Sequence, residues 1–331
     1  MKQSVVITAT LPEEATRILS RRYEVTSHPT EPARSEEELI TLLAEADGAI
    51  TLLTDPLTRR VLSSNPNLRV IGNYAVGVNN IDLEAARELG IEVTHTPGVL
   101  TDATADLTLA LLLAINRRLI EGDRVVRDGA FRYWDPLLLL GGSLQGKRLG
   151  IVGMGRIGSA VARRALAFGM EIAYHSRSSR ELDFPAERLE LESLLRTSDF
   201  VSIHTPLTPE THHLIDRRAF ELMKRDACIV NTSRGPVIDE GALAEALENR
   251  TIRGAALDVY EEEPEVEPRL LSLDNVILLP HLGSATFEAR TEMARTVAED
   301  VTAVLEGGRP RFPVLSPDRS PAPGEPEEDH S

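Results

Sequence analysis

The chain has 331 residues, of which 42% are hydrophobic and 27% charged, and it carries a formal net charge of -16. This composition is that of a globular protein of about two domains, and it excludes a collagen, a largely disordered chain and a disulfide-rich miniprotein. The acidic surplus argues against a nucleic-acid partner bound through its phosphates. The single cysteine, Cys228, forms no intramolecular disulfide, and neither a signal peptide nor a membrane-spanning run is recognisable, so we expect a cytoplasmic protein with no membrane partner.

Short, β-branched apolar runs alternate with helical patterns along the chain, as is typical of parallel α/β sheets. The first hundred residues contain one such series, which stops at Pro97 and Gly98. It predicts strands at 5–7, 48–53, 68–72 and 91–94 and a helix at 36–46.

The pattern changes after residue 100. The segment 101–118 is apolar at helical spacing and predicts one long helix, which is followed by a loop at 129–146. A second α/β series begins at Lys147. It predicts strands at 148–152, 171–174, 199–204, 227–231, 252–257 and 276–279, a helix at 156–168 and a final long helix at 284–306.

Two series of strands predict two doubly wound α/β domains. The long helices at 101–118 and 284–306 are the expected crossings between them, and the final helix returns to the first domain. We therefore expect a discontinuous first domain of residues 1–99 plus 286–316 and a second domain of residues 100–285. The remaining tail, 317–331, is rich in proline and acidic residues and is expected to be disordered.

A glycine motif stands at the start of the second series. It follows a predicted strand and opens a predicted helix, a context that favours a dinucleotide site over an ordinary turn. Gly153 allows a tight turn, Gly155 lets the backbone approach a pyrophosphate, and Gly158 lets helix and strand pack closely. The residues expected to bind the cofactor here are Gly153, Met154, Gly155, Arg156, Ile157 and Gly158.

The end of the next predicted strand distinguishes NAD from NADP. An acidic residue there would bind the ribose hydroxyls of NAD, but the sequence reads Tyr174-His175-Ser176-Arg177-Ser178. Small hydroxyls and an arginine suit a 2′-phosphate, so Ser176, Arg177 and Ser178 favour NADP(H) as the cofactor. In the alternative interpretation, Arg177 is a solvated loop residue and NAD(H) is used with less selectivity.

Three polar residues each follow the end of a later predicted strand, at the edge where open α/β sheets bind ligands. They are Arg234, Glu263 and His281 in chain order. Each alone has an ordinary explanation, as a surface charge, a solvated loop residue or a turn residue. Together, beside a dinucleotide site, they fit the reduction of a 2-keto acid.

This reaction needs a cation for the substrate carboxylate, a proton donor at the carbonyl oxygen and a group that keeps the donor charged. Arginine offers a bidentate fork that matches a carboxylate. Histidine titrates near neutrality and exchanges the proton, while a carboxylate on its other nitrogen fixes the tautomer and favours the charged form. The hydride comes from the cofactor.

At these residues the chain resembles the D-isomer-specific 2-hydroxyacid dehydrogenase family, over about residues 4–315. The motifs that carry the resemblance are, in chain order, GKRLGIVGMGRIG, NTSRGPVIDEGAL, GAALDVYEEEP and LLPHLGSAT. The resemblance implies that 100–285 is a Rossmann NAD(P)-binding domain and that the discontinuous first domain is a flavodoxin-like substrate domain. It also implies a site in the cleft between the domains and a homodimer built through the nucleotide-binding domains.

The resemblance further implies a role for each site residue. Arg234 clamps the substrate carboxylate together with the backbone N–H groups of Val76 and Gly77. His281 is the acid/base and Glu263 is its partner. Further positions are implied to contact the cofactor, with the nicotinamide carboxamide assigned to the aspartate: Thr104, Thr232, Ser233, Asp258 and Gly283.

Within the family, the segments NYAVGVNNID and TPGVLTDATADLTLALLLA look most like glyoxylate and hydroxypyruvate reductases. We therefore expect NAD(P)H-dependent reduction of glyoxylate or hydroxypyruvate to glycolate or D-glycerate. One alternative is another D-2-hydroxyacid dehydrogenase, of the phosphoglycerate or D-lactate type. Another is a dinucleotide-sensing protein like the family's transcriptional co-repressors, for which this chain offers no basic or peptide-binding tail.

The remaining polar residues are interpreted as structural. His212 and His213 are adjacent but lack a cysteine or carboxylate pattern, so we expect a loop there and no metal. Glu261 is treated as a surface residue. Trp134 is expected either to border the substrate cleft or to pack within its loop.

Overall fold

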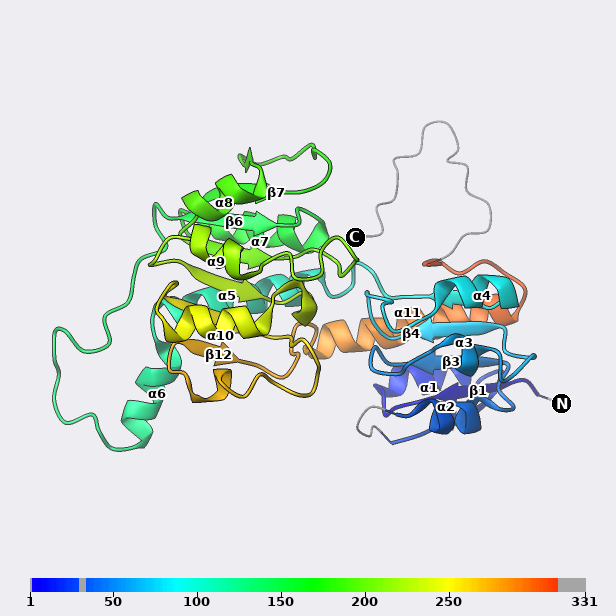
Figure 1. The fold of residues 1–331 in the computed structure, drawn as a ribbon. Helices are drawn as coiled ribbons and strands as arrows, with labels where there is room; N and C mark the ends of the chain where they lie inside the picture. Colours follow the sequence, from blue (N-terminus) through cyan, green and yellow to red (C-terminus); the bar gives the residue numbers. More distant parts are fainter. Residues whose placement is uncertain (1, 30–33, 315–331) are drawn as a thin grey trace. The chain divides into compact units, whose positions relative to one another are not determined.

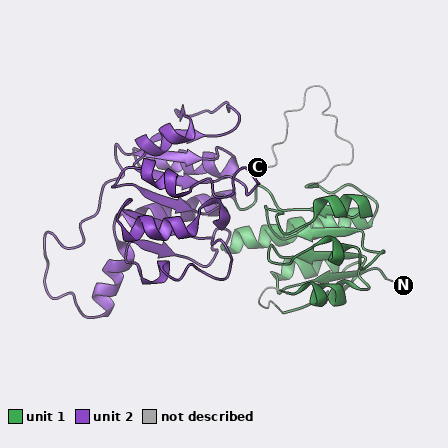
Figure 2. Cartoon of the chain, viewed as in Figure 1, with its two compact units in different colours: residues 1–100, 285–330 green, residues 101–284, 331 purple. Residues whose placement is uncertain are grey.

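The computed structural model describes residues 2–29 and 34–314, and these fall into two compact units (Figure 1). The first unit takes its described residues from Met1–Leu100 and Ala285–His330, and the second consists of Thr101–Ser284 (Figure 2). The chain therefore leaves the first unit after residue 100 and returns to it at residue 285. The tail predicted to be disordered, 317–331, lies outside the described residues.

The described residues of the first unit form a parallel five-stranded sheet with the order β2-β1-β3-β4-β5. This is the flavodoxin-like strand order, in agreement with the predicted doubly wound fold. The strands are β1 Ser4–Ile7, β2 Glu24–Ser27, β3 Gly48–Thr51, β4 Val70–Asn73 and β5 Glu92–Thr94. The helices are α1 Glu13–Leu19, α2 Glu36–Leu43, α3 Arg59–Leu62, α4 Leu83–Leu89 and α11 Phe287–Leu305.

Apolar layers cover both faces of this sheet. On one face α1 and α11 pack against the strands, and Val297 of α11 belongs to the same buried cluster as Ile50 of β3. On the other face Leu39 of α2 and Ala85 of α4 cluster with Ala49. Neighbouring residues of β3 thus face opposite layers, as the alternation of side chains along a strand requires.

The described residues of the second unit form a parallel seven-stranded sheet with the order β12-β11-β10-β9-β6-β7-β8. The strands are β6 Arg148–Val152, β7 Glu171–His175, β8 Glu187–Arg188, β9 Phe200–Ile203, β10 Cys228–Asn231, β11 Gly254–Leu257 and β12 Val276–Leu278. The α-helices are α5 Thr101–Asn116, α6 Leu119–Arg127, α7 Arg156–Ala167, α8 Leu191–Thr197, α9 Arg217–Leu222 and α10 Glu240–Glu248. Two 3₁₀ turns lie at Gly235–Val237 and Leu270–Ser272.

The order of these strands reverses at β6, which lies between β9 and β7. Helices α5 and α7 cover one face around Leu112 and Val161, while α8, α9 and α10 cover the other around Phe220 and Leu243. In sheets of this kind, ligands bind at the carboxyl edge where the strand order reverses. We therefore expect the ligand site at the turns that follow β6, β7 and their neighbours.

Some elements differ from those predicted from the sequence. The strands β2 and β8 were missed, because β2 is a mostly polar edge strand and β8 has two residues. The helix α6 was missed as well, and none of its residues is buried. The helix predicted at 101–118 ends at Asn116, and neither α5 nor α11 extends over both units.

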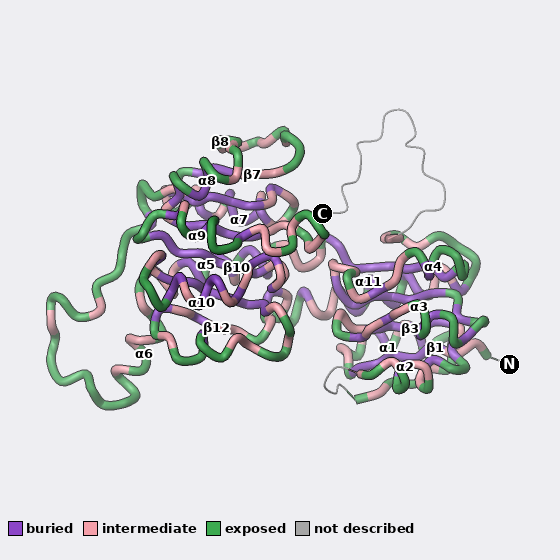
Figure 3. The backbone as a smooth tube through the Cα atoms, viewed as in Figure 1, coloured by how far each residue is buried: buried purple, intermediate pink, exposed green. Residues whose placement is uncertain are grey.

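The two sheets and the segment 119–140 differ in how far their residues are exposed to solvent. The sheets are buried, whereas α6 and the chain that follows it are largely exposed (Figure 3). Trp134 is 78% exposed, so the expectation that it packs within its loop is wrong. Among the described helices, none is both long enough and apolar enough to cross a membrane. In the segment 119–140, the exposed large apolar residues are Leu119, Ile120, Val126, Phe131, Tyr133, Trp134, Leu137, Leu138 and Leu140.

Candidate functional site

The glycine motif lies where the strand order reverses. Gly153 follows β6 with a φ of 98°, a backbone conformation that glycine adopts readily, and a Cβ there would lie 2.5 Å from the carbonyl oxygen of His204. A Cβ on Gly158, in the first turn of α7, would lie 2.2 Å from the Gly153 carbonyl oxygen. The backbone therefore packs around this loop more closely than side chains would permit.

The amino end of α7 follows this loop directly. Gly155 is the N-cap residue, has an extended backbone and brings no side chain to cap the first N–H groups of the helix. Uncapped N–H groups and the positive end of a helix dipole favour an anion. The loop and helix therefore fit the pyrophosphate of a dinucleotide.

His204 lies beside the same loop, after β9. Its Nε2 is 2.7 Å from the hydroxyl oxygen of Ser202. Burial lowers the pKa of His204 to about 3, so its ring is neutral at physiological pH. His204 is therefore a structural neighbour of the glycine loop and is unsuited to donate a proton.

The Ser176-Arg177-Ser178 turn follows β7 at the same edge of the sheet. The hydroxyl of Ser176 donates to the carbonyl oxygen of Ser178 at 2.6 Å, and Arg177 and Ser178 are exposed. Arg188 of β8 donates to the carbonyl oxygens of Ser176 and Arg177 at 3.0 and 3.2 Å. Arg188 thus braces the backbone of the turn, a role that the sequence pattern did not indicate.

His281 and Glu263 form a direct pair. Nδ1 of His281 donates to Oε2 of Glu263 at 2.8 Å, and Oε1 of Glu263 accepts the backbone N–H of Tyr260 at 3.1 Å. The side chains of His281 and Glu263 are 27% and 24% exposed. Burial acts to raise the pKa of Glu263, but the hydrogen bond and charge of His281, together with the N–H of Tyr260 and the charge of Arg234, lower this pKa below its ordinary value. Glu263 is therefore ionised at neutral pH, and Nε2 of His281 is the nitrogen left to exchange a proton.

A tight turn holds the backbone of His281. This residue has a φ of 54°, and its N–H donates to the carbonyl oxygen of Asp258 at 2.9 Å. The Asp258 carboxylate accepts the N–H groups of Leu282 at 2.6 Å and Gly283 at 2.7 Å. Burial raises the pKa of Asp258, while these hydrogen bonds act in the opposite direction. Asp258 therefore fixes the turn that carries His281.

Arg234 lies in the turn after β10. Its carbonyl oxygen accepts a hydrogen bond from Nδ2 of Asn231 at 2.9 Å, and its Nη1 donates to the carbonyl oxygen of Ser233 at 2.7 Å. Burial of the guanidinium lowers the pKa of Arg234, and the negative charge of Glu263 acts to raise it. Arg234 and Glu263 thus lie close enough for their charges to interact.

Gly235 allows the turns after β10 and β11 to meet. A Cβ at Gly235 would lie 1.8 Å from the carbonyl carbon and oxygen of Tyr260. Tyr260 also donates from its hydroxyl to the carbonyl oxygen of Leu279 at 2.8 Å. Tyr260 therefore joins the turns that carry Arg234, Glu263 and His281.

Replacing Gly235 by alanine is expected to destabilise the fold by about 1–3 kcal/mol, as overpacking does, because the new methyl group overlaps the backbone of Tyr260. Thermal unfolding measures this loss. The matched control is Gly122→Ala in α6, where a Cβ would meet nothing nearer than Leu139 at 3.8 Å. Equal stability losses in the two variants would contradict the proposed contact between the turns.

Helix α5 brings two threonines to the same edge. Oγ1 of Thr104 donates to the carbonyl oxygen of Gly283 at 3.1 Å, and Oγ1 of Thr108 is 3.0 Å from Oγ1 of Thr232. Thr104 and Thr232 are both buried. The structure therefore brings three of the predicted cofactor positions, Thr104, Thr232 and Gly283, to this edge, and Ser233 directly follows Thr232.

Val76 and Gly77 belong to the first unit, in the loop after β4. Their carbonyl oxygens accept hydrogen bonds from Nδ1 of His95 at 2.8 Å and from Nδ2 of Asn73 at 2.7 Å. These contacts hold the backbone of the loop. The other predicted site residues all lie in the second unit.

Glu261 is not the surface residue expected from the sequence. Its side chain is 29% exposed, its Oε1 contacts Nε2 of His213, and its Oε2 accepts the backbone N–H of Glu240 at 3.2 Å. Sequence patterns do not reveal the contacts among His213, Glu240 and Glu261, because these residues come from three separate parts of the chain.

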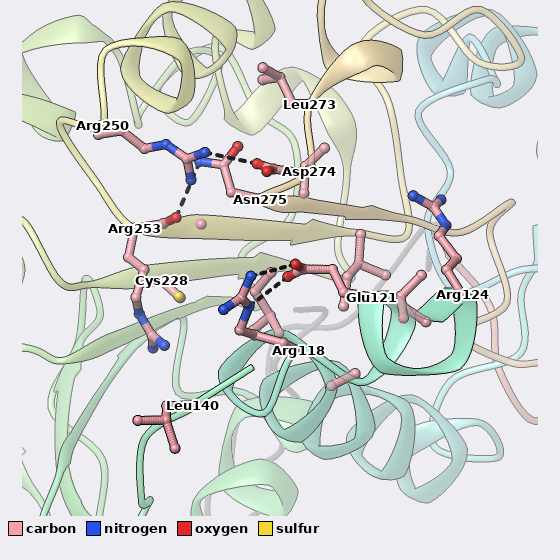
Figure 4. Close-up of a pocket in the computed structure, with 16 residues that line it drawn as sticks. Arg118, Glu121, Arg124, Leu140, Cys228, Arg250, Arg253, Leu273, Asp274 and Asn275 are labelled. Atoms are coloured by element: carbon pink, nitrogen blue, oxygen red, sulfur yellow. Dashed lines mark hydrogen bonds and ion pairs between the residues drawn. The ribbon is translucent and has the colours of Figure 1, made fainter. Parts of the chain in front are cut away.

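A cavity of about 340 Å³ lies elsewhere in the second unit (Figure 4). Its lining includes Cys228, Gly254 and Val276, which are the first residues of three neighbouring strands. Arg118 and Glu121 pair at its wall, with Nη2 and Oε2 2.6 Å apart. The cavity therefore lies at the amino edge of the sheet, opposite to the edge that carries the candidate site.

Comparison with known proteins identifies the class. Residues 109–283 match the family model described as D-isomer specific 2-hydroxyacid dehydrogenase, NAD binding domain. The chain is also 47% identical to the glyoxylate reductase of Thermococcus litoralis over 317 residues, which cover 94% of this chain and 96% of that protein. This protein belongs to the D-isomer-specific 2-hydroxyacid dehydrogenase family, as its motifs predicted.

Solved structures agree with this assignment. A Thermus thermophilus protein is 48% identical, with a TM-score of 0.90 and coverage of 95% of this chain and 100% of that one. An NADPH-dependent glyoxylate/hydroxypyruvate reductase from Sinorhizobium meliloti, in complex with NADP and malonate, is 31% identical with a TM-score of 0.83, covering 95% and 97%. The predicted α/β fold with a Rossmann NAD-binding domain is confirmed.

Proposed function

We propose that this 2-hydroxyacid dehydrogenase reduces glyoxylate or hydroxypyruvate to glycolate or D-glycerate with NAD(P)H, and that His281 is its acid/base. The observation that carries the proposal is the hydrogen bond of 2.8 Å between His281 and Glu263, at the sheet edge that also holds Arg234. The Thermococcus litoralis and Sinorhizobium meliloti relatives, both named as glyoxylate reductases, support this choice of substrate.

In this proposal Arg234 binds the substrate carboxylate through its guanidinium fork. Nε2 of His281 donates a proton to the carbonyl oxygen, while Glu263 holds Nδ1 and balances the charge of the imidazolium. Bound NAD(P)H supplies the hydride that reduces the carbonyl carbon. His281 then recovers its proton from solvent, to which its side chain is 27% exposed. Val76 and Gly77 are proposed as further carboxylate donors on the family resemblance alone.

The proposed cofactor is NADP(H), for which NAD(H) can substitute. The glycine loop and the uncapped amino end of α7 fit the pyrophosphate that both dinucleotides share. The preference rests on the turn after β7, where Ser176, Arg177 and Ser178 stand in place of an acidic residue. The guanidinium of Arg177 is exposed and suits the additional phosphate of NADP.

Arg177→Ala is expected to raise the KM for NADPH about tenfold or more, because a hydrogen bond to a charged group contributes about 1.5–3 kcal/mol. The KM for NADH is expected to change little, since NADH has no phosphate there. Initial rates with each cofactor measure both values. Arg196→Ala, an exposed arginine of α8, is the control for the lost charge. An equal rise in both KM values would contradict the assignment of Arg177.

The exposed apolar segment 119–140 supports the homodimer that the family resemblance implies. Nine large apolar residues of this segment are exposed, and a second copy of the chain that covered them would remove them from water. Sedimentation of the full chain is expected to give the mass of a dimer, and a monomer would contradict the proposed homodimer.

We also propose a cytoplasmic location, which is supported by the free, buried thiol of Cys228.

The loss of reduced nicotinamide absorbance tests the proposed function. Glyoxylate, hydroxypyruvate and pyruvate are each supplied with NADPH and with NADH. Fast oxidation of NADPH by glyoxylate or hydroxypyruvate is expected, whereas a preference for pyruvate would favour a D-lactate type of enzyme. No oxidation with any pair, from folded protein that binds a dinucleotide, would favour the co-repressor-like alternative.

A further inference from the structure

A second group of histidines and a carboxylate lies outside the proposed reaction site. His212, His213 and Glu261 each offer one ligand atom, and these atoms all lie within 4.8 Å of one another. The rings of the two histidines are 4.0 Å apart between centroids and are inclined by 31°. Nε2 of His213 contacts Oε1 of Glu261 directly. Two imidazoles and a carboxylate therefore converge, although the two chain segments are far apart in sequence.

The backbone holds the two histidines in this arrangement. The N–H of His212 donates to the carbonyl oxygen of Thr208 at 3.0 Å, and the N–H of His213 donates to that of Pro236 at 2.8 Å. His213 has a φ of 51°, a left-handed conformation that few residues other than glycine adopt. This turn is anchored at both residues, so the positions of the rings are not left to a freely moving loop.

The carboxylate of Glu261 is positioned by contacts with Glu240, the first residue of α10. Oε2 of Glu261 accepts the N–H of Glu240 at 3.2 Å, and the N–H of Glu261 donates to Oε1 of Glu240 at 2.6 Å. One oxygen of Glu261 is thus used by the first residue of a helix, while the other faces His213. Such outer contacts orient the ligands of many metal sites.

The donor set indicates which ions fit. Imidazole nitrogens with one carboxylate oxygen suit zinc and similar divalent transition metals, whereas magnesium and calcium prefer oxygen ligands. Tetrahedral zinc with bonds of about 2.0–2.1 Å needs ligand atoms roughly 3.4 Å apart, so the present atoms need only small side-chain shifts. His212 is exposed and the other two side chains are partly exposed, which leaves an approach for the ion and a position for water.

From this geometry we propose that His212, His213 and Glu261 form a binding site for a divalent transition metal of the zinc class, separate from the His281–Glu263 pair. Glu261 and Glu263 belong to one turn, in which Tyr260 donates its N–H to Glu263. An ion bound to Glu261 therefore restrains the segment that also carries Glu263. Occupation of the site is expected to stabilise the fold, because the ion binds the folded arrangement of the three ligands.

Calorimetric titration of the untagged, metal-free full chain with zinc chloride tests this site. The wild type is expected to bind one zinc ion per chain, and its melting temperature is expected to rise with zinc. His212→Asn removes an exposed ligand and is expected to weaken the affinity about tenfold or more, since mutation of even an outer partner of a metal ligand costs about 10–100-fold. Glu261→Gln, whose amide oxygen can still accept from Glu240, is expected to weaken it similarly.

The control is His281→Asn, which removes the other accessible histidine–glutamate pair of the second unit. Zinc binding is expected to survive this change. Wild-type zinc affinity in both His212→Asn and Glu261→Gln, or loss of zinc binding in His281→Asn alone, would overturn the proposed site. An absence of any zinc binding by the folded wild type would overturn it as well. Circular dichroism of each variant shows whether it is folded.

Discussion

His281→Ala is expected to lower kcat for the reduction of glyoxylate by about 10²–10⁴-fold, the usual contribution of a positioned proton donor. The affinity for NADPH is expected to stay near that of the wild type, since His281 takes no part in the proposed pyrophosphate or ribose contacts. Stopped-flow measurement of hydride transfer and a separate titration with NADPH determine the two quantities.

The backbone at His281 calls for a second variant, because its φ of 54° is unfavourable for alanine. Asparagine tolerates this conformation, so His281→Asn separates loss of the imidazole from strain in the turn. Glu263→Gln is expected to lower the rate less than the loss of His281, since an amide oxygen can still accept from Nδ1 but does not carry the negative charge that balances the imidazolium. Near wild-type turnover in both His281 variants would refute the role assigned to this residue.

Arg234→Ala is expected to lower kcat/KM by about 10²–10⁴-fold, mainly through a higher KM for the keto acid. The proposed fork makes two hydrogen bonds to the carboxylate, each contributing about 1.5–3 kcal/mol. Arg234→Lys keeps the charge but loses the fork, so it is expected to recover only part of the affinity. Initial rates over a range of glyoxylate concentrations measure both constants.

Arg218→Ala is the control for Arg234, because Arg218 is an exposed arginine of the same unit that pairs with Glu192 at 2.5 Å. Its KM for glyoxylate is expected to match that of the wild type. If Arg234→Ala also kept a wild-type KM, the substrate carboxylate would have to bind elsewhere.

The sequence predicted the architecture because strands buried on both faces carry a strong signal. Runs such as Leu149 to Val152 are apolar and end at glycine or polar residues, which made the parallel sheets recognisable. The edge strand β8 gives no such signal, since it has two exposed residues, Glu187 and Arg188. Its Arg188 nevertheless braces the turn at Ser176, a contact that depends on the fold.

The candidate site was predictable only in part. Arg234, Glu263 and His281 follow three strand ends, and strand ends of a parallel sheet share one edge, so their proximity follows from the pattern. The contacts that position these three residues do not follow from the sequence pattern. Asp258 holds the His281 turn through N–H groups 24 and 25 residues away, and Gly235 meets the backbone of Tyr260.

The same limit explains the interpretation of Glu261 as a surface residue. Nothing near Glu261 in sequence indicates that His213 lies against it, because the two residues are 48 positions apart. Their contact depends on how the turns after β9 and β11 fold, and periodicity carries no information about such turns. Contacts such as that between His213 and Glu261, for which no motif prepares the reader of the sequence, are thus the part of this protein that only the structure provides.

Transfer of deuterium from the cofactor to the product tests the proposed reduction of a 2-keto acid to a D-2-hydroxy acid. The full chain is supplied with hydroxypyruvate and with NADPH that carries deuterium at both hydrogen positions of C4 of the nicotinamide, and the product is analysed by chiral chromatography and mass spectrometry. The expected product is D-glycerate that carries one deuterium on the former carbonyl carbon. Glycerate without deuterium, or of the L configuration, would contradict it.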